Sequence, residues 1–135
     1  EVPLSMKELE FDLMEHYWHC PTLLSMFSPT MLFKILTNVL LGRSTVFVHD
    51  NLAVLTSVVL AIKTLIRPFQ WCYTLVPVLP TILLETLEAP QPCLVGITRR
   101  DYENYVQTEM NQNEISAVTW VLLDPSCYFS IDEAD

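Results

Sequence analysis

The sequence predicts an α/β fold, with a mostly parallel open sheet that carries helices on both faces. Short runs rich in β-branched residues alternate along the chain with segments whose apolar residues recur at helical spacing. The strand-like runs are apolar at nearly every position rather than at every second one. Continuous apolar runs of this kind are typical of strands covered on both faces, as in parallel sheets.

The strand-like runs are residues 45–49, 73–78, 93–97 and 118–123. Pro77 falls inside the second run. Because proline has no backbone N–H to donate to a neighbouring strand, we expect this run at an edge of the sheet or at a bulge.

Helical spacing marks the segments 30–41, 52–66 and 81–87. Each is preceded or begun by residues suited to cap it: Ser28 for the first, Asp50 and Asn51 for the second, and Thr81 for the third. Gly42 stands where a glycine commonly follows a helix. The second segment is expected to bury a wide face made by positions 52, 55, 58, 59, 62, 65 and 66.

The two ends of the chain are less regular. Residues 7–15 are expected to form a loop or short helix, and Pro21 is expected to break the segment that follows them. Residues 101–109 are expected to form a helical turn or loop. We therefore divide the chain into a linking segment (1–22), an α/β core (23–124) and an acidic tail or the start of a further region (125–135). The chain begins at Glu1 rather than methionine, so we expect it to be a piece of a longer protein.

Charge is distributed unevenly along the 135 residues, which carry a net charge of −9. Residues 1–15 hold five acidic residues and one basic residue, and residues 101–135 hold eight acidic residues and no basic one. Acidic ends repel a phosphate backbone and an anionic membrane surface, so nucleic-acid binding is not expected. Hydrophobic residues make up 51% of the chain, and we expect partners or neighbouring domains to cover part of this surface.

The cysteines at positions 20, 72, 93 and 127 are widely spaced and form no C-x-x-C pair. This spacing indicates reduced thiols and a cytoplasmic location rather than a disulfide framework. The long uncharged stretch at residues 68–84 contains three prolines and cannot form a continuous membrane helix.

Polar residues follow the predicted strands, where open α/β sheets usually bind ligands. One interpretation makes His49, Asp50 and Asp124 an active site. The alternative, which we favour, gives these residues turn-forming and capping roles. No G-x-S-x-G pattern for a nucleophilic serine is present.

Cofactor and metal sites are not expected. The chain has only two glycines, Gly42 and Gly96, and neither begins a glycine-rich loop that could hold a phosphate group. His16, His19 and Cys20 would share one face of a helix and could approach a zinc ion, but no second cluster of ligands is present.

Arg99 and Arg100 form the only adjacent basic pair and follow the third predicted strand. They are the best candidates for contact with an acidic surface of a partner protein, and Asp124, at the end of the fourth strand, joins them as a third candidate. A solvated loop pair is the alternative.

Three stretches resemble the core of the DENN domain, with coverage from about residue 23 to residue 123. They read Leu-Leu-Gly-Arg-Ser-Thr-Val-Phe-Val at 40–48, Pro-Phe-Gln-Trp at 68–71 with Val-Pro-Val-Leu-Pro at 76–80, and Leu-Glu-Ala-Pro-Gln-Pro-Cys-Leu-Val-Gly-Ile at 87–97. The prolines suit sharp entries to and exits from strands, and Gly96 suits a close approach of two chain segments.

The resemblance implies the central part of a three-part module, between a longin-like region and a helical region. It implies a protein-binding core that promotes GDP release from Rab-type small GTPases, without covalent chemistry or cofactor, in membrane trafficking. Such a protein is expected in the cytoplasm, peripherally at vesicle membranes. A DENN-like scaffold or complex subunit without exchange activity is the alternative, and a small-molecule α/β enzyme is a third.

Overall fold

The computed structural model of the chain describes residues 4–109, 118–123 and 131–132. Within these residues the centre is a five-stranded sheet with the order β2-β3-β1-β4-β5. The strands are β1 (Ser44–Val48), β2 (Thr74–Val76), β3 (Cys93–Ile97), β4 (Val118–Leu122) and β5 (Ile131–Asp132). The first four run parallel, and β5 pairs antiparallel with β4. The predicted α/β class and the mostly parallel sheet are therefore confirmed.

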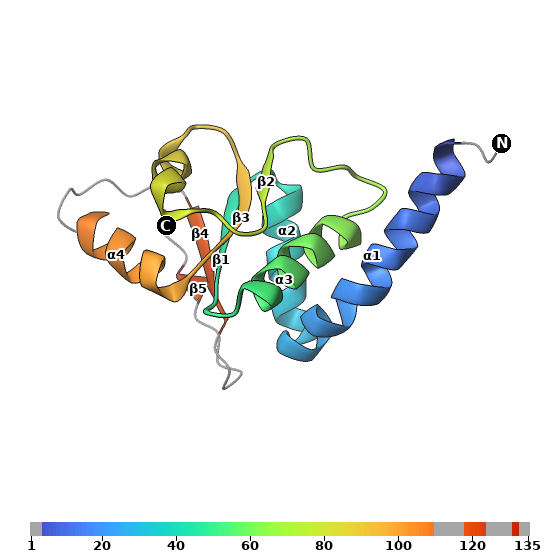
Figure 1. Cartoon of the computed structure of the whole chain (residues 1–135), viewed down its shortest axis with the longest axis horizontal. Helices are drawn as coiled ribbons and strands as arrows, with labels where there is room; N and C mark the ends of the chain where they lie inside the picture. Colours follow the sequence, from blue (N-terminus) through green and yellow to red (C-terminus); the bar gives the residue numbers. More distant parts are fainter. Residues whose placement is uncertain (1–3, 110–117, 124–130, 133–135) are drawn as a thin grey trace.

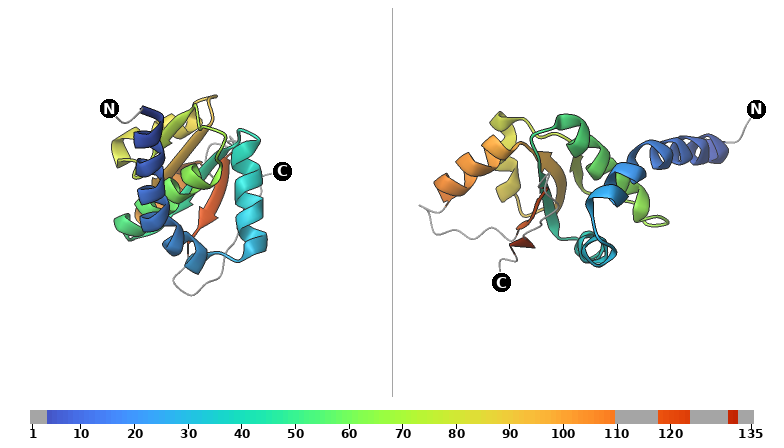
Figure 2. Two further views of the ribbon diagram at one scale, coloured as in Figure 1. Left: turned by 90° about the vertical axis from the view of Figure 1, so that its right-hand side faces the viewer. Right: turned by 90° about the horizontal axis from the view of Figure 1, so that it is seen from below.

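Helices cover both faces of this sheet (Figure 1). On one face lie α1 (Leu4–Met26), α2 (Pro29–Leu40) and α3 (Leu52–Leu65). On the other lie the 3-10 helix η1 (Thr81–Glu88) and α4 (Arg99–Glu109). The two turned views in Figure 2 show the same layered arrangement, with the sheet between the two groups of helices.

The division of the helices between the faces follows from the direction of each crossover. The connection through α3 leads from β1 outward to the edge strand β2, whereas the connections through η1 and α4 lead back from β2 to β3 and then past β1 to β4. Because crossovers between parallel strands are right-handed, reversing the direction places the connecting helix on the opposite face.

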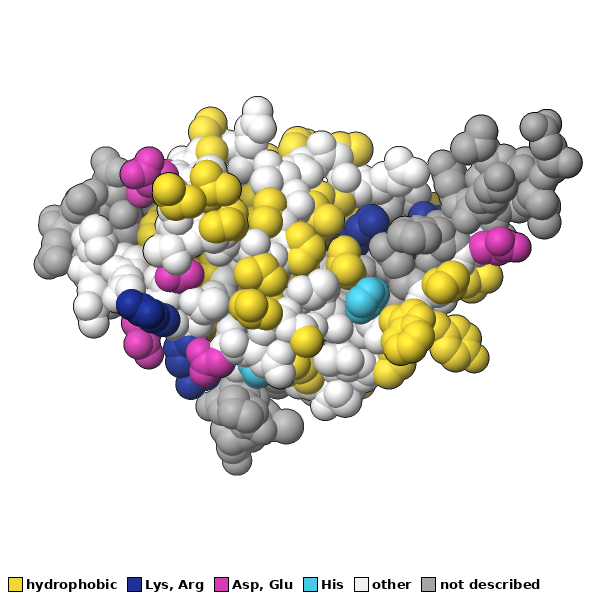
Figure 3. Space-filling model, viewed as in Figure 1, with side chains coloured by type: hydrophobic (Ala, Val, Ile, Leu, Met, Phe, Trp, Pro, Cys, Tyr) yellow, Lys and Arg dark blue, Asp and Glu magenta, His cyan; other side chains and the backbone are white. Residues whose placement is uncertain are grey.

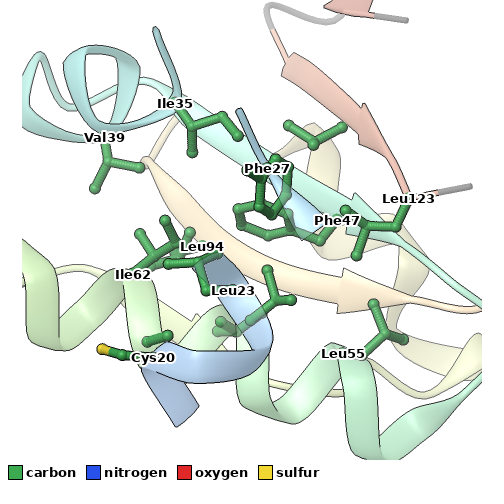
Figure 4. Close-up of a cluster of buried hydrophobic side chains, with 14 of the residues drawn as sticks. Cys20, Leu23, Phe27, Ile35, Val39, Phe47, Leu55, Ile62, Leu94 and Leu123 are labelled. Carbon is green, nitrogen blue, oxygen red and sulfur yellow. The ribbon is translucent and has the colours of Figure 1, made fainter. Parts of the chain in front are cut away.

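The larger part of the core lies under α1, α2 and α3. Figure 4 shows Phe47 and Leu94 of the sheet surrounded by side chains from all three helices, among them Leu23, Ile35 and Leu55. All five side chains are at most 1% exposed. Burial of an aliphatic or aromatic side chain of this size contributes about 2 kcal/mol, so this face supplies most of the stabilising apolar contact.

A second buried cluster lies under η1 and α4. It contains Val46 and Val48 of β1, the neighbours of Phe47 that point to the opposite face. Trp120 of β4 packs here against Tyr102 and Tyr105, at ring-centroid distances of 5.1 and 5.6 Å. Burial of β1 on both faces explains its continuously apolar sequence, as we expected.

The predicted caps of α2 and α3 are confirmed. The Ser28 hydroxyl accepts a hydrogen bond from the Met31 N–H (3.4 Å), and the Asn51 side chain accepts one from the Ala53 N–H (2.9 Å). After α2, Gly42 adopts a φ of 72°, and the Arg43 N–H donates to the Asn38 carbonyl (3.1 Å), which closes the helix end.

The prediction for the start of the chain is wrong in one respect. Pro21 does not interrupt the helix, because α1, which is 23 residues long, continues through this position. Pro21 is exposed, so water can solvate the carbonyl group that its missing N–H leaves without a partner. Cys20, Leu23 and Phe27 are buried in the same cluster as residues of α3 and hold the second half of α1 in place. The helix therefore also crosses residues 22 and 23, which we placed in different segments.

Three smaller differences concern other elements. The segment expected as a turn or loop at 101–109 belongs to the helix α4, which starts at Arg99. The strand β5 was not predicted. The strand that precedes Pro77, β2, lies at an edge of the sheet, as expected.

Among the described residues, no single helix has the length and apolar character needed to cross a membrane. One bent pair, His16–Met26 and Pro29–Leu40, passes the same test of length and composition together, with 119° between its halves.

Candidate functional site

The segments that follow the parallel strands meet at one edge of the sheet, which we call the carboxyl edge. Three backbone hydrogen bonds connect them: His49 N–H to the Ile97 carbonyl (3.2 Å), Leu79 N–H to the Gly96 carbonyl (2.7 Å), and Leu123 N–H to the Val48 carbonyl (3.0 Å). The chain therefore leaves all four parallel strands at neighbouring positions.

The carboxyl edge contains a point at which the chain diverges to opposite faces. After β1 the chain turns to α3 on one face, and after the adjacent strand β3 it turns to α4 on the other. In open α/β sheets, the space outside two such strands is the usual place for a bound molecule or partner. Residues 49–51 and 98–101 border this point.

The segment after β1 is arranged as a capped turn. The Asn51 N–H donates to His49 Nδ1 (2.9 Å), and the Asn51 side chain in turn caps α3. His49 Nδ1 is thus occupied as an acceptor and is not free to act as a base. The interpretation of His49 as a turn-forming residue is confirmed, and the catalytic interpretation has no support from this contact.

The segment after β3 connects α4 with η1. The Thr98 hydroxyl accepts a hydrogen bond from the Asp101 N–H (3.3 Å), and Asp101 accepts one from the Thr81 hydroxyl (2.9 Å). Asp101 is only 7% exposed, so the bond from the Thr81 hydroxyl stabilises a buried carboxylate. A carboxylate in the first turn of α4 is also favoured by the helix dipole.

Thr81 was expected to cap the short helix that follows it, and this prediction is wrong. The residue at the N-cap of η1 is Pro80, which makes no side-chain cap. The Thr81 hydroxyl instead forms the bond to Asp101, twenty residues further along the chain. No local pattern predicts a partner at that separation.

Arg99 and Arg100 occupy the first two positions of α4, at the carboxyl edge. Arg99 is half-buried and Arg100 is exposed. The positive end of a helix dipole repels a basic side chain at the N-terminus, so helix stability does not explain two arginines at this place. Asp124, the third candidate, lies outside the described residues.

Two exposed apolar side chains lie at the same edge. Leu52 begins α3 and is 51% exposed, although we expected it on the buried face, and Ile82, next to Thr81, is 86% exposed. We call Leu52, Ile82, Arg99 and Arg100 the carboxyl-edge surface. Sequence periodicity missed the exposure of Leu52 because the first turn of α3 extends past the end of the sheet.

The space-filling view supports this description. Basic side chains lie together with acidic ones at the lower left of Figure 3, where α4 begins in Figure 1. Exposed apolar side chains and arginines at one edge of a sheet are residue types expected of a surface that binds a protein.

The cysteines that the structure describes show no sign of catalytic activation. Burial raises the pKa of Cys20 and also that of Cys93, where a hydrogen bond from the side chain of Ser44 opposes the shift. A raised pKa makes a thiol a poorer nucleophile at neutral pH because less of it is ionised. The described residues contain no group of three or more His, Cys, Asp or Glu side chains that could hold a metal ion.

The histidines near the start of the chain have structural partners. His16 Nδ1 lies 3.3 Å from Cys20 Sγ within α1, and His19 Nδ1 lies 3.3 Å from the Ser57 hydroxyl of α3. The His19 contact therefore joins α1 to α3, whereas the His16 contact lies within α1.

Fold and surface together define an α/β domain whose candidate contact region is the carboxyl edge of a mostly parallel sheet. Residues 4–125 match the sequence profile of the DENN (AEX-3) domain. Since the match covers most of the chain, the protein belongs to the DENN domain family.

Similar proteins include human DENN domain-containing protein 2B, with 39% identity over 70 residues, or 52% of this chain. Human DENN domain-containing protein 2D is 30% identical over 91 residues, or 67% of this chain. A fungal protein, elicitor of plant defense protein 1 of Gibberella zeae, is 33% identical over 81 residues, or 55% of this chain. The matched part is 6%, 19% and 7% of the length of these three relatives, respectively.

Proposed function

We propose that this chain is the central, GTPase-contacting core of a DENN-type guanine-nucleotide exchange factor for Rab-family small GTPases. Membership of the DENN family supports this proposal. The observation that carries it to particular residues is the carboxyl-edge surface, where two arginines unexplained by helix stability occur at the same edge of the sheet as two exposed apolar side chains.

The proposed action is binding rather than covalent chemistry. An exchange factor accelerates GDP release when it binds the GTPase more tightly in a conformation that holds nucleotide poorly. A thousandfold acceleration requires about 4 kcal/mol of preference for that conformation over the nucleotide-bound one. In this proposal Leu52 and Ile82 supply apolar contact, and Arg99 and Arg100 face acidic side chains of the GTPase.

The experiment measures GDP release from a panel of Rab proteins in the presence of the full-length protein that carries this chain. We expect a large acceleration for one or two Rabs. Failure to accelerate release from any Rab, with folded protein, would contradict the exchange proposal and favour the scaffold or complex subunit.

A charge reversal tests the residues. We expect Arg100→Glu to lower the exchange efficiency by about tenfold or more, because an acidic side chain would repel the partner surface. Arg43→Glu is the matched control, since Arg43 is also exposed but lies at the start of β1, at the opposite end of the strand. Equal loss in both variants would mean that overall charge, not this edge, governs binding.

We also propose that the protein works in the cytoplasm, peripherally at vesicle membranes where Rab proteins act. Cell fractionation tests this location, with and without the active form of the Rab that the GDP-release assay identifies. Recovery in the membrane fraction that is unaffected by the Rab would count against it.

A further inference from the structure

The first part of α1 carries a group of large apolar side chains that point into solvent. Leu13, Met14, Tyr17 and Trp18 are 57%, 61%, 83% and 75% exposed. Leu13 and Tyr17 are one helical turn apart, as are Met14 and Trp18, so the four side chains lie together. We call them the α1 ridge, and they line a hollow of about 420 Å³.

The ridge does not belong to the core. α1 is attached to the body by Cys20 and Leu23 in its second half and by Phe27, which directly follows the helix. Figures 1 and 2 show the first half of α1 extending beyond the sheet and the other helices, and Figure 3 shows apolar side chains gathered along the middle of α1. No other element among residues 4–109, 118–123 and 131–132 lines the hollow.

An arrangement of this kind is costly unless a partner covers it. Two consecutive aromatic side chains, each more than 70% exposed, are unusual for a free surface and typical of the centre of an interface. A helix segment without tertiary contacts is also only marginally stable in water, so a partner would stabilise the projecting half as well as its side chains.

The charge around the ridge selects the kind of partner. Glu10, one turn before Leu13 and Met14, is exposed. Four acidic residues occur between positions 8 and 15, and no lysine or arginine occurs between positions 8 and 33. A second copy of this chain would bring these acidic segments together, whereas a basic partner would be attracted to them.

We propose that the α1 ridge is a docking surface for an amphipathic helix of a partner protein, whose apolar stripe is flanked by lysine or arginine. The ridge supplies the apolar anchors, Tyr17 and Trp18 among them, and the acidic sequence of residues 8–15 favours a partner with basic flanks. The ridge lies on a different element from the carboxyl-edge surface, so the proposal does not depend on GTPase binding.

The first test uses two labelled peptides of about 18 residues, long enough to form a helix on the surface. One peptide is an amphipathic helix of leucine and lysine, and the other has glutamate in place of every lysine. Fluorescence anisotropy with the full chain should show binding of the lysine peptide at least about tenfold tighter than that of the glutamate peptide. Equal affinity would overturn the proposal.

The second test separates the ridge from the general attraction of a chain with net charge −9. We expect Tyr17→Ser and Trp18→Ser each to weaken the lysine peptide by about tenfold. Phe33→Ser, a change at an aromatic residue of α2 that is 71% exposed, should leave the affinity within about twofold. Circular dichroism checks that each variant is folded, and the two ridge variants serve as replicates of one another.

Two results would overturn the proposal. One is equal binding by the ridge variants and the control, which would assign the affinity to net charge alone. The other is a dimer of the unmodified chain in sedimentation analysis that Trp18→Ser converts to a monomer, because the ridge would then bind a second copy.

Discussion

Gly96 occupies a position in β3 that leaves no room for a side chain. A Cβ atom at this position of β3 would overlap the Pro77 carbonyl oxygen and would lie 3.2 Å from Leu55 Cδ2. Displacement of the neighbouring backbone would strain the hydrogen bond from the Leu79 N–H to the Gly96 carbonyl. The expected close approach at Gly96 is therefore confirmed.

We predict that Gly96→Ala lowers the free energy of unfolding by about 3 kcal/mol, because a methyl group must displace backbone of the edge strand. Gly42→Ala is the control: a Cβ there meets nothing within 4 Å, and the φ of 72° alone costs roughly 1 kcal/mol. Urea denaturation of both variants measures the difference. A loss at Gly96 no larger than at Gly42 would contradict the steric explanation.

The cysteine thiols should differ in reactivity. Cys72 is exposed, whereas burial raises the pKa of Cys20 and Cys93 above the ordinary value of 9.0. A thiol with a raised pKa holds its proton more tightly in the folded state, so its contribution to stability is present below pH 9.0 and is lost as the pH rises further.

At neutral pH we therefore expect iodoacetamide to modify Cys72 well before Cys20 and Cys93, as followed by peptide mass spectrometry. Addition of urea should bring the three rates together, because unfolding exposes the buried thiols. Comparable rates in the folded chain would show that burial does not protect Cys20 and Cys93.

Among the elements, α1 departs most from its sequence pattern. A proline and dispersed acidic residues favoured a broken segment, yet the structure has one helix from Leu4 to Met26. The contact between its second half and α3 overrides the local preference, since proline costs a helix only one hydrogen bond and a local distortion. The ridge precedes this contact along α1 and stays outside the core.

The elements η1 and α4 depend on each other through one hydrogen bond. Replacement of Thr81 by valine leaves the Asp101 carboxylate, which is 7% exposed, without this donor. We predict that Thr81→Val lowers the free energy of unfolding by about 1.5 kcal/mol.

The matched control for this bond is Thr56→Val, whose hydroxyl bonds only to the Leu52 carbonyl within α3 (2.9 Å) and should cost less than about 0.5 kcal/mol. A double-mutant cycle with Asp101→Ala should show a coupling energy of about 1 kcal/mol between positions 81 and 101. Strict additivity would rule out the bond as the connection between the two elements.

At the scale of the whole molecule, β1 is the common wall of two buried clusters. Phe47 faces the helices α1, α2 and α3, and its neighbours Val46 and Val48 face η1 and α4. Loss of packing on one side of this strand therefore affects the sheet on which both clusters depend.

We predict that Phe47→Ala lowers the free energy of unfolding by about 4 kcal/mol, because it removes a fully buried aromatic side chain and leaves a cavity. Phe33→Ala, at a residue 71% exposed, should change it by less than about 0.5 kcal/mol. Thermal unfolding followed by circular dichroism compares the two. A small effect at Phe47 would mean that the chain repacks around the cavity.

Much of the fold was predictable because its signals are local. The runs that form β1, β3 and β4, the spacing that forms α2 and α3, and the caps at Ser28 and Asn51 each depend on a few adjacent residues. The place of Arg99 and Arg100 at a strand end was also predictable, since it follows from the position of β3 alone.

The candidate site was predictable only in part, because its other members come from separate elements. Leu52 and Ile82 look like ordinary core residues in the sequence, and only the end of the sheet leaves them exposed. Asp101 and Thr81 give no local sign that they bind one another.

The order of apolar and β-branched segments was sufficient to specify an α/β fold with a parallel sheet, because side-chain periodicity and backbone preference act over a few residues. The strand order, the continuation of α1 through Pro21, the bond between Thr81 and Asp101 and the two exposed surfaces were decided by the tertiary structure. These features depend on which segments, far apart in the chain, bury one another. The packing of the whole molecule decides which segments these are, and the neighbouring residues in the sequence carry no signal of it.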